Sequence, residues 1–205
     1  MPEANETPKK MEEIAVILAG GGGRRMDGAD KGAIMLGGRR LIDHVLARLA
    51  PQADRILISG RHDYGTGLTV IPDCEDGPRG PAAGLWAALN WIDKNNSDTD
   101  GFLSVPADGP FLPADLFTRL ADATGSAVAC DGTGAHPTFA FWRCDDLYGA
   151  LSGGPAQYGF PLKELADSVH ARRVMFKDAN AFLNVNEPDD LVRAEMLLVH
   201  RAVER

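Results

Sequence analysis

Blocks of apolar residues alternate with polar ones along the chain, and the blocks differ in their spacing. The first block, 14–19, is a continuous apolar run that ends at four glycines. A run of this kind is typical of a strand buried on both faces of a parallel sheet. Positions 41–50 instead carry apolar residues at helical spacing and stop before Pro51, which predicts a helix.

The same alternation continues to the end of the chain. The blocks that predict further strands are 55–59, 68–71, 101–105, 126–130, 138–142 and 174–176. The blocks that predict further helices are 81–89, 113–123, 145–151, 161–169 and 188–203. Strands that alternate with helices form βαβ units, so we predict an α/β fold with an open, mostly parallel sheet and helices on both faces.

The length of 205 residues favours one domain, which we place at 13–205. Residues 1–12 are polar and lack the apolar stretch of a secretory signal, so we expect a mobile leader, with Met11 as an alternative start. No apolar run approaches the length of a membrane span. The three cysteines form no Cys-x-x-Cys pair, which favours free thiols over a disulfide or zinc framework. Together these features predict a cytoplasmic protein with no membrane contact.

Charge is unevenly spread along the chain. The formal net charge is -8, which argues against a nucleic-acid partner because such a partner requires a basic face. The segment from Gly20 to Leu41, however, has five basic and two acidic residues, a local charge of +3, and leaves -11 on the remainder. A short basic segment in an acidic chain indicates a small anionic ligand.

The glycines that follow the first predicted strand are typical of a loop that brings backbone amides close to phosphate. Neither the dinucleotide fingerprint nor the P-loop pattern fits, because Arg25 or Met26 occupies the last glycine position of the former and Asp30 precedes Lys31. What remains is a loop of about twenty residues, a length that is usually functional or disordered. Arg24, Arg25 and Lys31 make it suited to a triphosphate, with a solvated basic turn as the alternative.

Asp108 is the candidate metal ligand. It follows the buried strand 101–105, at the carboxyl end where open α/β sheets bind their ligands. Magnesium is commonly held by one or two carboxylates and by substrate phosphates. A turn aspartate between Pro106 and Pro110 is the structural alternative.

The segment LAGGGGRRMDGADKGAIMLGGRRLIDHVL resembles the signature of the molybdenum cofactor guanylyltransferase family, a group of MobA-like nucleotidyltransferases. Further blocks that resemble the family follow in its order and extend the likeness from Ile14 to about Leu198. They are Val70–Asp73, Gly80–Gly84, Pro106–Phe111, His136–Thr138 and Asn184–Pro188. The last two are the more specific to guanylyltransferases.

This resemblance implies a Rossmann-like nucleotidyltransferase fold and an Mg2+-dependent enzyme. It would transfer GMP from GTP to the phosphate of the molybdopterin cofactor and release pyrophosphate. Transient contacts with cofactor-donor proteins and with molybdoenzymes or their chaperones are implied as well. Two alternatives remain open. One is a cytidylyltransferase or another phosphate-ester nucleotidyltransferase of the same fold, and the other is a non-catalytic nucleotide-binding or cofactor-delivery module.

The resemblance also implies roles for individual residues. Lys31, Asp108 and Arg25 match the catalytic positions, with Asp108 on the metal and Arg25 near the leaving pyrophosphate. The positions that match the nucleotide site are Leu18, Ala19, Gly20, Gly21, Lys31, Ser59, Asp73 and Asp108. Asn184 and Asn186 match the pterin side, although Asn186 could instead cap the last helix.

Three features depart from the family. Asp27 stands where a glycine usually follows Arg-Met, and Ser59 lies in a segment that often contains asparagine. The segment 153–158 lacks the arginines often found on the pterin side, and Arg172 and Arg173 come later in the chain.

Overall fold

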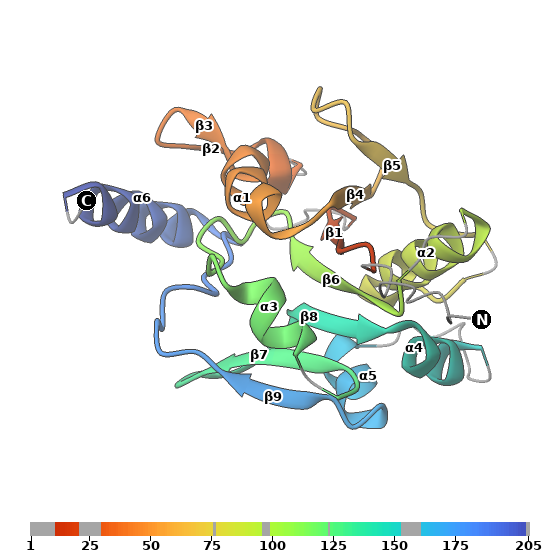
Figure 1. The fold of residues 1–205 in the computed structure, drawn as a ribbon. Helices are drawn as coiled ribbons and strands as arrows, with labels where there is room; N and C mark the ends of the chain where they lie inside the picture. The colour runs from red at the N-terminus through yellow and green to blue at the C-terminus, as the bar shows by residue number, and fades with distance from the viewer. Residues whose placement is uncertain are drawn as a thin grey trace, which may run out of the picture.

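One sheet of seven strands, in the order β5-β4-β1-β6-β8-β7-β9, forms the centre of the molecule in this computed structural model (Figure 1). The structure describes residues 11–20, 30–75, 77–95, 99–122, 124–152 and 161–203. The strands of the sheet are β1 (Ile14–Leu18), β4 (Arg55–Ser59), β5 (Thr69–Ile71), β6 (Gly101–Pro106), β7 (Ala127–Asp131), β8 (Gly134–Arg143) and β9 (Arg172–Met175). All seven match predicted blocks to within a few residues.

The sheet is mostly parallel, as predicted. β1 pairs in parallel with β4 and β6, and β4 with β5. β8 is antiparallel to both of its neighbours, β6 and β7, and β9 is parallel to β7. β8 can reverse direction because it follows β7 through a tight turn, whereas the parallel pairs are joined by longer crossovers.

Helices cover both faces of the sheet (Figure 1). They are α1 (Leu41–Leu49), α2 (Pro81–Lys94), α3 (Leu116–Ala121), α4 (Cys144–Leu151), α5 (Leu162–Ser168) and α6 (Pro188–Val203). Alternate residues of β1 enter different cores: Ile17 packs with apolar residues of α1 and α3, and Val16 with those of α2, α4 and α5. This two-sided burial explains why β1 is continuously apolar.

A third, smaller core joins α6 to a hairpin outside the main sheet. The hairpin consists of β2 (Met35–Leu36) and β3 (Arg39–Arg40) and turns through Gly37 and Gly38, both at positive φ. Leu36 and Ala194 are buried together in this core. Figure 1 shows α6 and the hairpin on the same side of the molecule. The last helix is therefore attached to the segment that follows the glycine loop.

Two sequence expectations need correction. The helix expected to start at Pro113 begins instead at Leu116. The side chain of Gln52, just after α1, fixes the turn before α3. It donates to Pro113 O at 3.0 Å and accepts from Phe117 N at 3.0 Å. The segment before α1 is also more ordered than a plain loop, because residues 31–33 form a 3-10 turn and β2 and β3 follow it.

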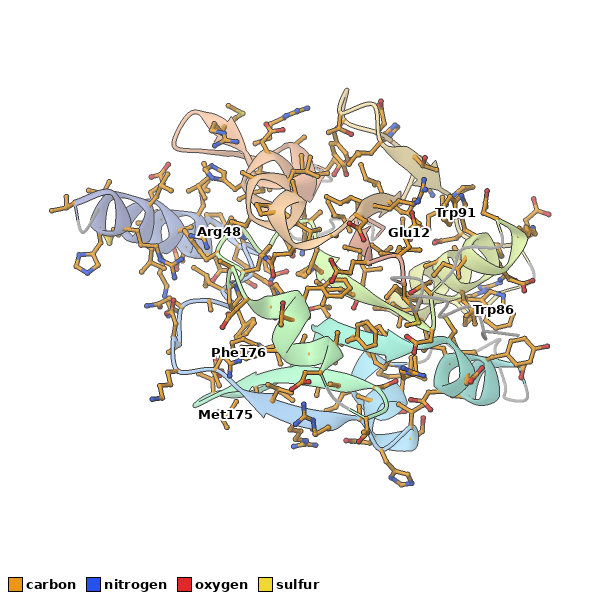
Figure 2. The ribbon with its side chains drawn as sticks, viewed as in Figure 1. Glu12, Arg48, Trp86, Trp91, Met175 and Phe176 are labelled. Carbon is orange, nitrogen blue, oxygen red and sulfur yellow. The ribbon has the colours of Figure 1, made fainter. Side chains whose placement is uncertain are left out.

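Residues 11–13, at the boundary of the expected leader, are tied to the start of β4. Glu12 accepts a hydrogen bond from Arg55 Nε at 2.6 Å, and the Arg55 guanidinium lies 5.7 Å from the centre of the Trp91 ring. Figure 2 shows Glu12 and Trp91 on the same side of the molecule. Residues 1–10 lie outside the described residues, so the mobile leader stays a prediction.

The predicted free thiols are confirmed, since none of Cys74, Cys130 and Cys144 forms a disulfide. Burial raises the pKa of the Cys144 thiol to about 11, and it also raises the pKa of Cys130. No helix in the described part of the chain combines the length and apolar character needed to cross a bilayer.

Candidate active site

The carboxyl ends of β1 and β6 meet where the strand order reverses. After β1 the chain builds β4 and β5 on one side, and it then returns to place β6 on the other side of β1. Such a switch point leaves a crevice in which open α/β sheets bind ligands. The two strand ends are joined directly, because Ala107 N donates to Leu18 O at 3.1 Å.

Lys31 and Asp108 meet at this crevice. Lys31 Nζ donates to Asp108 Oδ2 at 2.9 Å, and the same ammonium group donates to Asn186 Oδ1. The Lys31 side chain is 30% exposed and that of Asp108 is 10% exposed. The structure thus brings together three predicted site residues that are far apart in the sequence. The Asn186 side chain binds Lys31, so the alternative in which it caps α6 does not apply here.

The segment that carries Asn186 is fixed at both ends. On one side, Val185 N donates to Asp108 O at 2.9 Å. On the other, Asp190 Oδ2 accepts from the backbone N–H groups of Asn186 and Glu187, each at 3.0 Å. A carboxylate in the first turn of a helix satisfies N–H groups that the helix leaves unpaired and interacts well with the helix dipole. Asp190 thereby fixes Asn186 beside Lys31.

The turn that presents Lys31 is held by Asp30 and Tyr64. Asp30 Oδ1 accepts from Gly32 N at 3.1 Å and from the Tyr64 hydroxyl at 2.6 Å. Burial, together with the Asp30 carboxylate, raises the pKa of Tyr64, so this hydroxyl keeps its proton. A Cβ at Gly32 would lie 2.9 Å from the Tyr64 ring, so the ring needs a glycine there to pack this closely. The sequence analysis gave no role to Asp30, although it precedes Lys31 in the signature segment, and no motif marks Tyr64.

Arg40 is used within the fold. Its Nε and Nη2 atoms donate to the two carboxylate oxygens of Asp43 at 2.8 and 2.7 Å, a bidentate pair that also raises the pKa of Arg40. Its Nη1 donates to the backbone oxygen of Tyr64. This arrangement fixes the start of α1 and favours a structural role for Arg40 over phosphate binding.

The predicted nucleotide-binding residues lie along the ends of β1 and β4. Leu18 ends β1, Ala19 N donates to Ser59 O at 2.8 Å, and Gly20 is exposed beyond them. Ser59 is 1% exposed, and Gly84 of α2 lies so close that an added Cβ would be 2.6 Å from Ser59 Oγ. Sequence reasoning placed Gly84 in a family block but gave it no role. Its role is to let the first turns of α2 pack against these strand ends.

One predicted nucleotide-site residue, Asp73, is not brought to the Lys31–Asp108 pair, and others lie outside the described part of the chain. Asp73 is exposed on the turn after β5, and no contact joins it to that pair. Gly21 and Arg25 lie outside the described residues, as do Arg24 and Asp27, so their roles stay predictions. Arg173 is bound to Asp167 at 3.1 Å.

Asn184 has an unsatisfied polar atom. Its Oδ1 is buried and has no hydrogen-bond partner among the described residues. Leaving a buried acceptor unpaired costs about 1–3 kcal/mol of folding free energy. An unpaired atom of this kind in a folded protein usually reflects local strain or a site for a ligand. Asn184 lies two residues before Asn186, on the segment attached to Asp108.

The residues present fit a magnesium ion that is shared with substrate. No group of three or more His, Cys, Asp or Glu side chains suited to a metal occurs among the described residues, so a closed all-protein cage is absent there. Mg2+ keeps several waters and needs only one or two carboxylates plus phosphate oxygens. The Asp108 carboxylate provides one such ligand at the crevice.

A cavity of about 350 Å3 between α1, α3, α6 and the segment after β9 does not include these residues. It lies near the side chains labelled Arg48, Met175 and Phe176 in Figure 2. Its arginines are used within the fold: Arg119 stacks 3.8 Å from the Phe176 ring centre, and Arg201 binds Asp178 at 2.6 Å. The crevice at Asp108 is therefore the better candidate for the active site.

Comparison with known proteins agrees with this geometry. Residues 15–169 match the MobA-like NTP transferase domain. The chain belongs to the MobA-like NTP transferase family. A curated member, the molybdenum cofactor guanylyltransferase of Cereibacter sphaeroides strain ATCC 17029, is 41% identical over 198 residues, which cover 92% of this chain and 98% of the relative.

Solved structures with the same fold include two kinds of protein. Molybdopterin-guanine dinucleotide biosynthesis protein A from Archaeoglobus fulgidus has a TM-score of 0.67 and 23% identity, and the match covers 91% of this chain and 99% of that one. The 4-diphosphocytidyl-2C-methyl-D-erythritol synthase of Anaerococcus prevotii has a TM-score of 0.68 and 13% identity, over 92% and 99% of the two chains. These likenesses confirm the predicted nucleotidyltransferase fold.

Proposed function

We propose that this MobA-like protein is a molybdenum cofactor guanylyltransferase, which transfers GMP from GTP to the phosphate of molybdopterin and releases pyrophosphate. Two observations support the proposal: the name of the 41% identical relative, and the Lys31–Asp108 pair at the sheet's switch point. The pair is the observation from this chain that carries it. We place the reaction in the cytoplasm and expect transient contacts with cofactor-donor proteins and with recipient molybdoenzymes or their chaperones.

Nucleotidyl transfer brings two anions together, so its barrier falls when cationic groups gather and neutralise the phosphate oxygens. Lys31 provides such a charge and is already aimed at the crevice by the Asp30–Tyr64 anchor. In the structure, Asp108 and Asn186 bind its ammonium group. We propose that nucleotide phosphate replaces Asp108 as the partner of Lys31, which frees the carboxylate.

Asp108 would then hold magnesium. When bound, that ion supplies charge neutralisation at the phosphates and helps to orient them. Asp108 is suited to this role because its backbone oxygen and that of Leu18 are both bound to neighbouring segments, which fixes its position. Asn186 retains its contact with Lys31 and keeps the ammonium near the same oxygens. Arg25, in the glycine loop, would assist the leaving pyrophosphate.

The nucleotide base and ribose would lie over the ends of β1 and β4, against Leu18, Ala19 and Ser59. The pterin would lie over the segment of Asn184 and Asn186. The unpaired Asn184 oxygen would accept a hydrogen bond from the N–H groups of the pterin ring. This arrangement places donor and acceptor on opposite flanks of Asp108.

The deciding experiment measures pyrophosphate release with purified molybdopterin and each nucleoside triphosphate in turn. We expect release with GTP that depends on both the acceptor and Mg2+. Preferential use of CTP would reject the proposal in favour of a cytidylyltransferase, the alternative suggested by the fold shared with the 4-diphosphocytidyl-2C-methyl-D-erythritol synthase. Nucleotide binding without release would indicate a delivery module.

A further inference from the structure

His136, near the start of β8, has no role in the function proposed above. His136 pairs in register with Ala129 of β7, but the next register pair is Val128 with Ala140. β8 thus contains three extra residues, 137–139, between partners that are consecutive on β7. Bulges of this kind redirect side chains and are common beside active sites.

The bulge changes the face on which His136 lies. In an uninterrupted strand His136 would share a face with Ala140 and Trp142, which pack in the α2–α4–α5 core. Instead its ring stacks on Phe182, with centroids 4.8 Å apart and an interplanar angle of 24°. Phe182 belongs to the other core and also packs edge-on against Phe139, 5.0 Å away.

Asp131, the last residue of β7, lies against the imidazole. His136 Nε2 lies 3.0 Å from Asp131 Oδ2, off the hydrogen-bond axis. The other carboxylate oxygen accepts from Thr133 N at 2.7 Å and from Thr133 Oγ1 at 2.6 Å. Although burial acts in the other direction, these hydrogen bonds and His136 together lower the pKa of Asp131 to about 2. A buried carboxylate therefore stays charged next to a ring that is about one-fifth exposed.

The fold puts His136 on the acceptor flank of Asp108. β6 lies between β1 and β8 in the sheet. Asp108, just after β6, therefore has Lys31 on the β1 side and the start of β8 on the other side. Phe182, on which His136 stacks, is three residues before Val185, whose N–H binds Asp108 O. Asn184, with its unpaired oxygen, lies between the two.

In-line transfer requires the attacking and leaving oxygens to lie on opposite sides of the reacting phosphorus. Lys31 would occupy the nucleotide side, so an anionic nucleophile needs a donor on the opposite side. We infer that His136 binds the attacking phosphate of the acceptor, and that Asp131 is the positioning residue that holds the imidazole there. This inference rests on the proposed function, because it assigns the acceptor end of the same site.

The test compares His136→Ala, His136→Gln and Asp131→Asn with a matched control, His170→Gln, which changes an exposed histidine on the turn after α5. Three quantities are measured for each protein: the KM for GTP, the KM for molybdopterin, and the dissociation constant of molybdopterin without nucleotide, which is followed by the pterin fluorescence. His136→Ala should raise the molybdopterin KM and dissociation constant about ten- to a hundredfold, the usual effect of a charge-assisted hydrogen bond. The KM for GTP should change less than about twofold.

His136→Gln keeps a hydrogen-bond donor and should recover part of the affinity, and Asp131→Asn should weaken molybdopterin binding while leaving the KM for GTP unchanged. Thermal melting checks that each variant folds, and His136→Gln serves if the alanine variant does not. Unchanged molybdopterin affinity, or an equal rise in both KM values, would overturn the inference while leaving the guanylyltransferase proposal intact. If the wild type binds molybdopterin but transfers no nucleotide, the proposed function fails and the binding data still test His136.

Discussion

Replacing Asp108 with asparagine tests the centre of the proposed site. The change removes the carboxylate charge while keeping the size of the side chain and the backbone contact to Val185. We expect kcat to fall at least about a hundred- to a thousandfold, the scale seen when one electrostatic stabiliser of a transition state is lost. Pyrophosphate release with GTP, molybdopterin and Mg2+ measures it.

The same variant has a calculable effect on stability. Breaking a fully buried ion pair by removing one partner costs about 3–5 kcal/mol. Here the Lys31 side chain is 30% exposed and keeps Asn186 as a partner, so solvent and the second acceptor reduce the loss to about 1–2 kcal/mol. For a chain of this size that corresponds to a fall in Tm of about 2–8 °C.

Asp115→Asn is the matched control, because it removes an exposed carboxylate seven positions further along the chain that lies 3.8 Å from Arg119. We expect it to change neither kcat nor Tm appreciably. If Asp108→Asn melted like the wild type and kept more than about a tenth of its kcat, the assignment of Asp108 as metal ligand and partner of Lys31 would be wrong.

Three further predictions follow from separate contacts. Gly84→Ala should lower the free energy of unfolding by about 1–3 kcal/mol and raise the KM for GTP, because the added Cβ would lie 2.6 Å from Ser59 Oγ. The control is Gly149→Ala in α4, where an added Cβ would have no atom within 4 Å. In urea melts this control should be as stable as the wild type or slightly more stable. The pKa of Asp131 is lowered to about 2, so its charge stabilises the fold above the normal aspartate pKa and this contribution is lost as the pH falls from about 4 to about 2. The difference in unfolding free energy between wild type and Asp131→Asn should shrink over that interval; a constant difference would exclude the linkage. A disulfide reagent at pH 8 should modify Cys144 more slowly than Cys74, because the thiol pKa of Cys144 is raised to about 11, and equal rates would contradict that raised pKa.

Most of the fold could be predicted because burial leaves a regular pattern in the sequence. β1 is apolar throughout, and β6 is apolar except for the buried Ser104, since both faces of these strands are covered. α6 has the predicted bounds because Pro188 and the following acidic residues mark its start. The two-residue strands β2 and β3 could not be predicted, because they are too short to show a period. The bulge in β8 was also missed, since it depends on register with β7.

The site was predicted as separate residues rather than as an arrangement. Lys31 and Asp108 were found from their neighbours in sequence, a glycine loop and a buried strand. Their common partner Asn186 is 155 positions from Lys31, and only the folded chain shows that the two meet. One signal could have helped: Asp190, an acidic residue in the first turn of the last helix, indicates a backbone that is fixed just before it.

The contacts of Lys31 have a consequence for the order in which the chain becomes competent. Its ammonium group is bound by residues that follow β6 and that precede α6, so the site draws on the beginning, the middle and the end of the sequence. During synthesis, the strands that carry the glycine loop and Asp108 emerge well before residue 186. The contact between Asn186 and Lys31 can form only once residue 186 has emerged, and the same segment is joined to Asp108 through Val185 N, so the completed site depends on nearly the whole chain rather than on its N-terminal part.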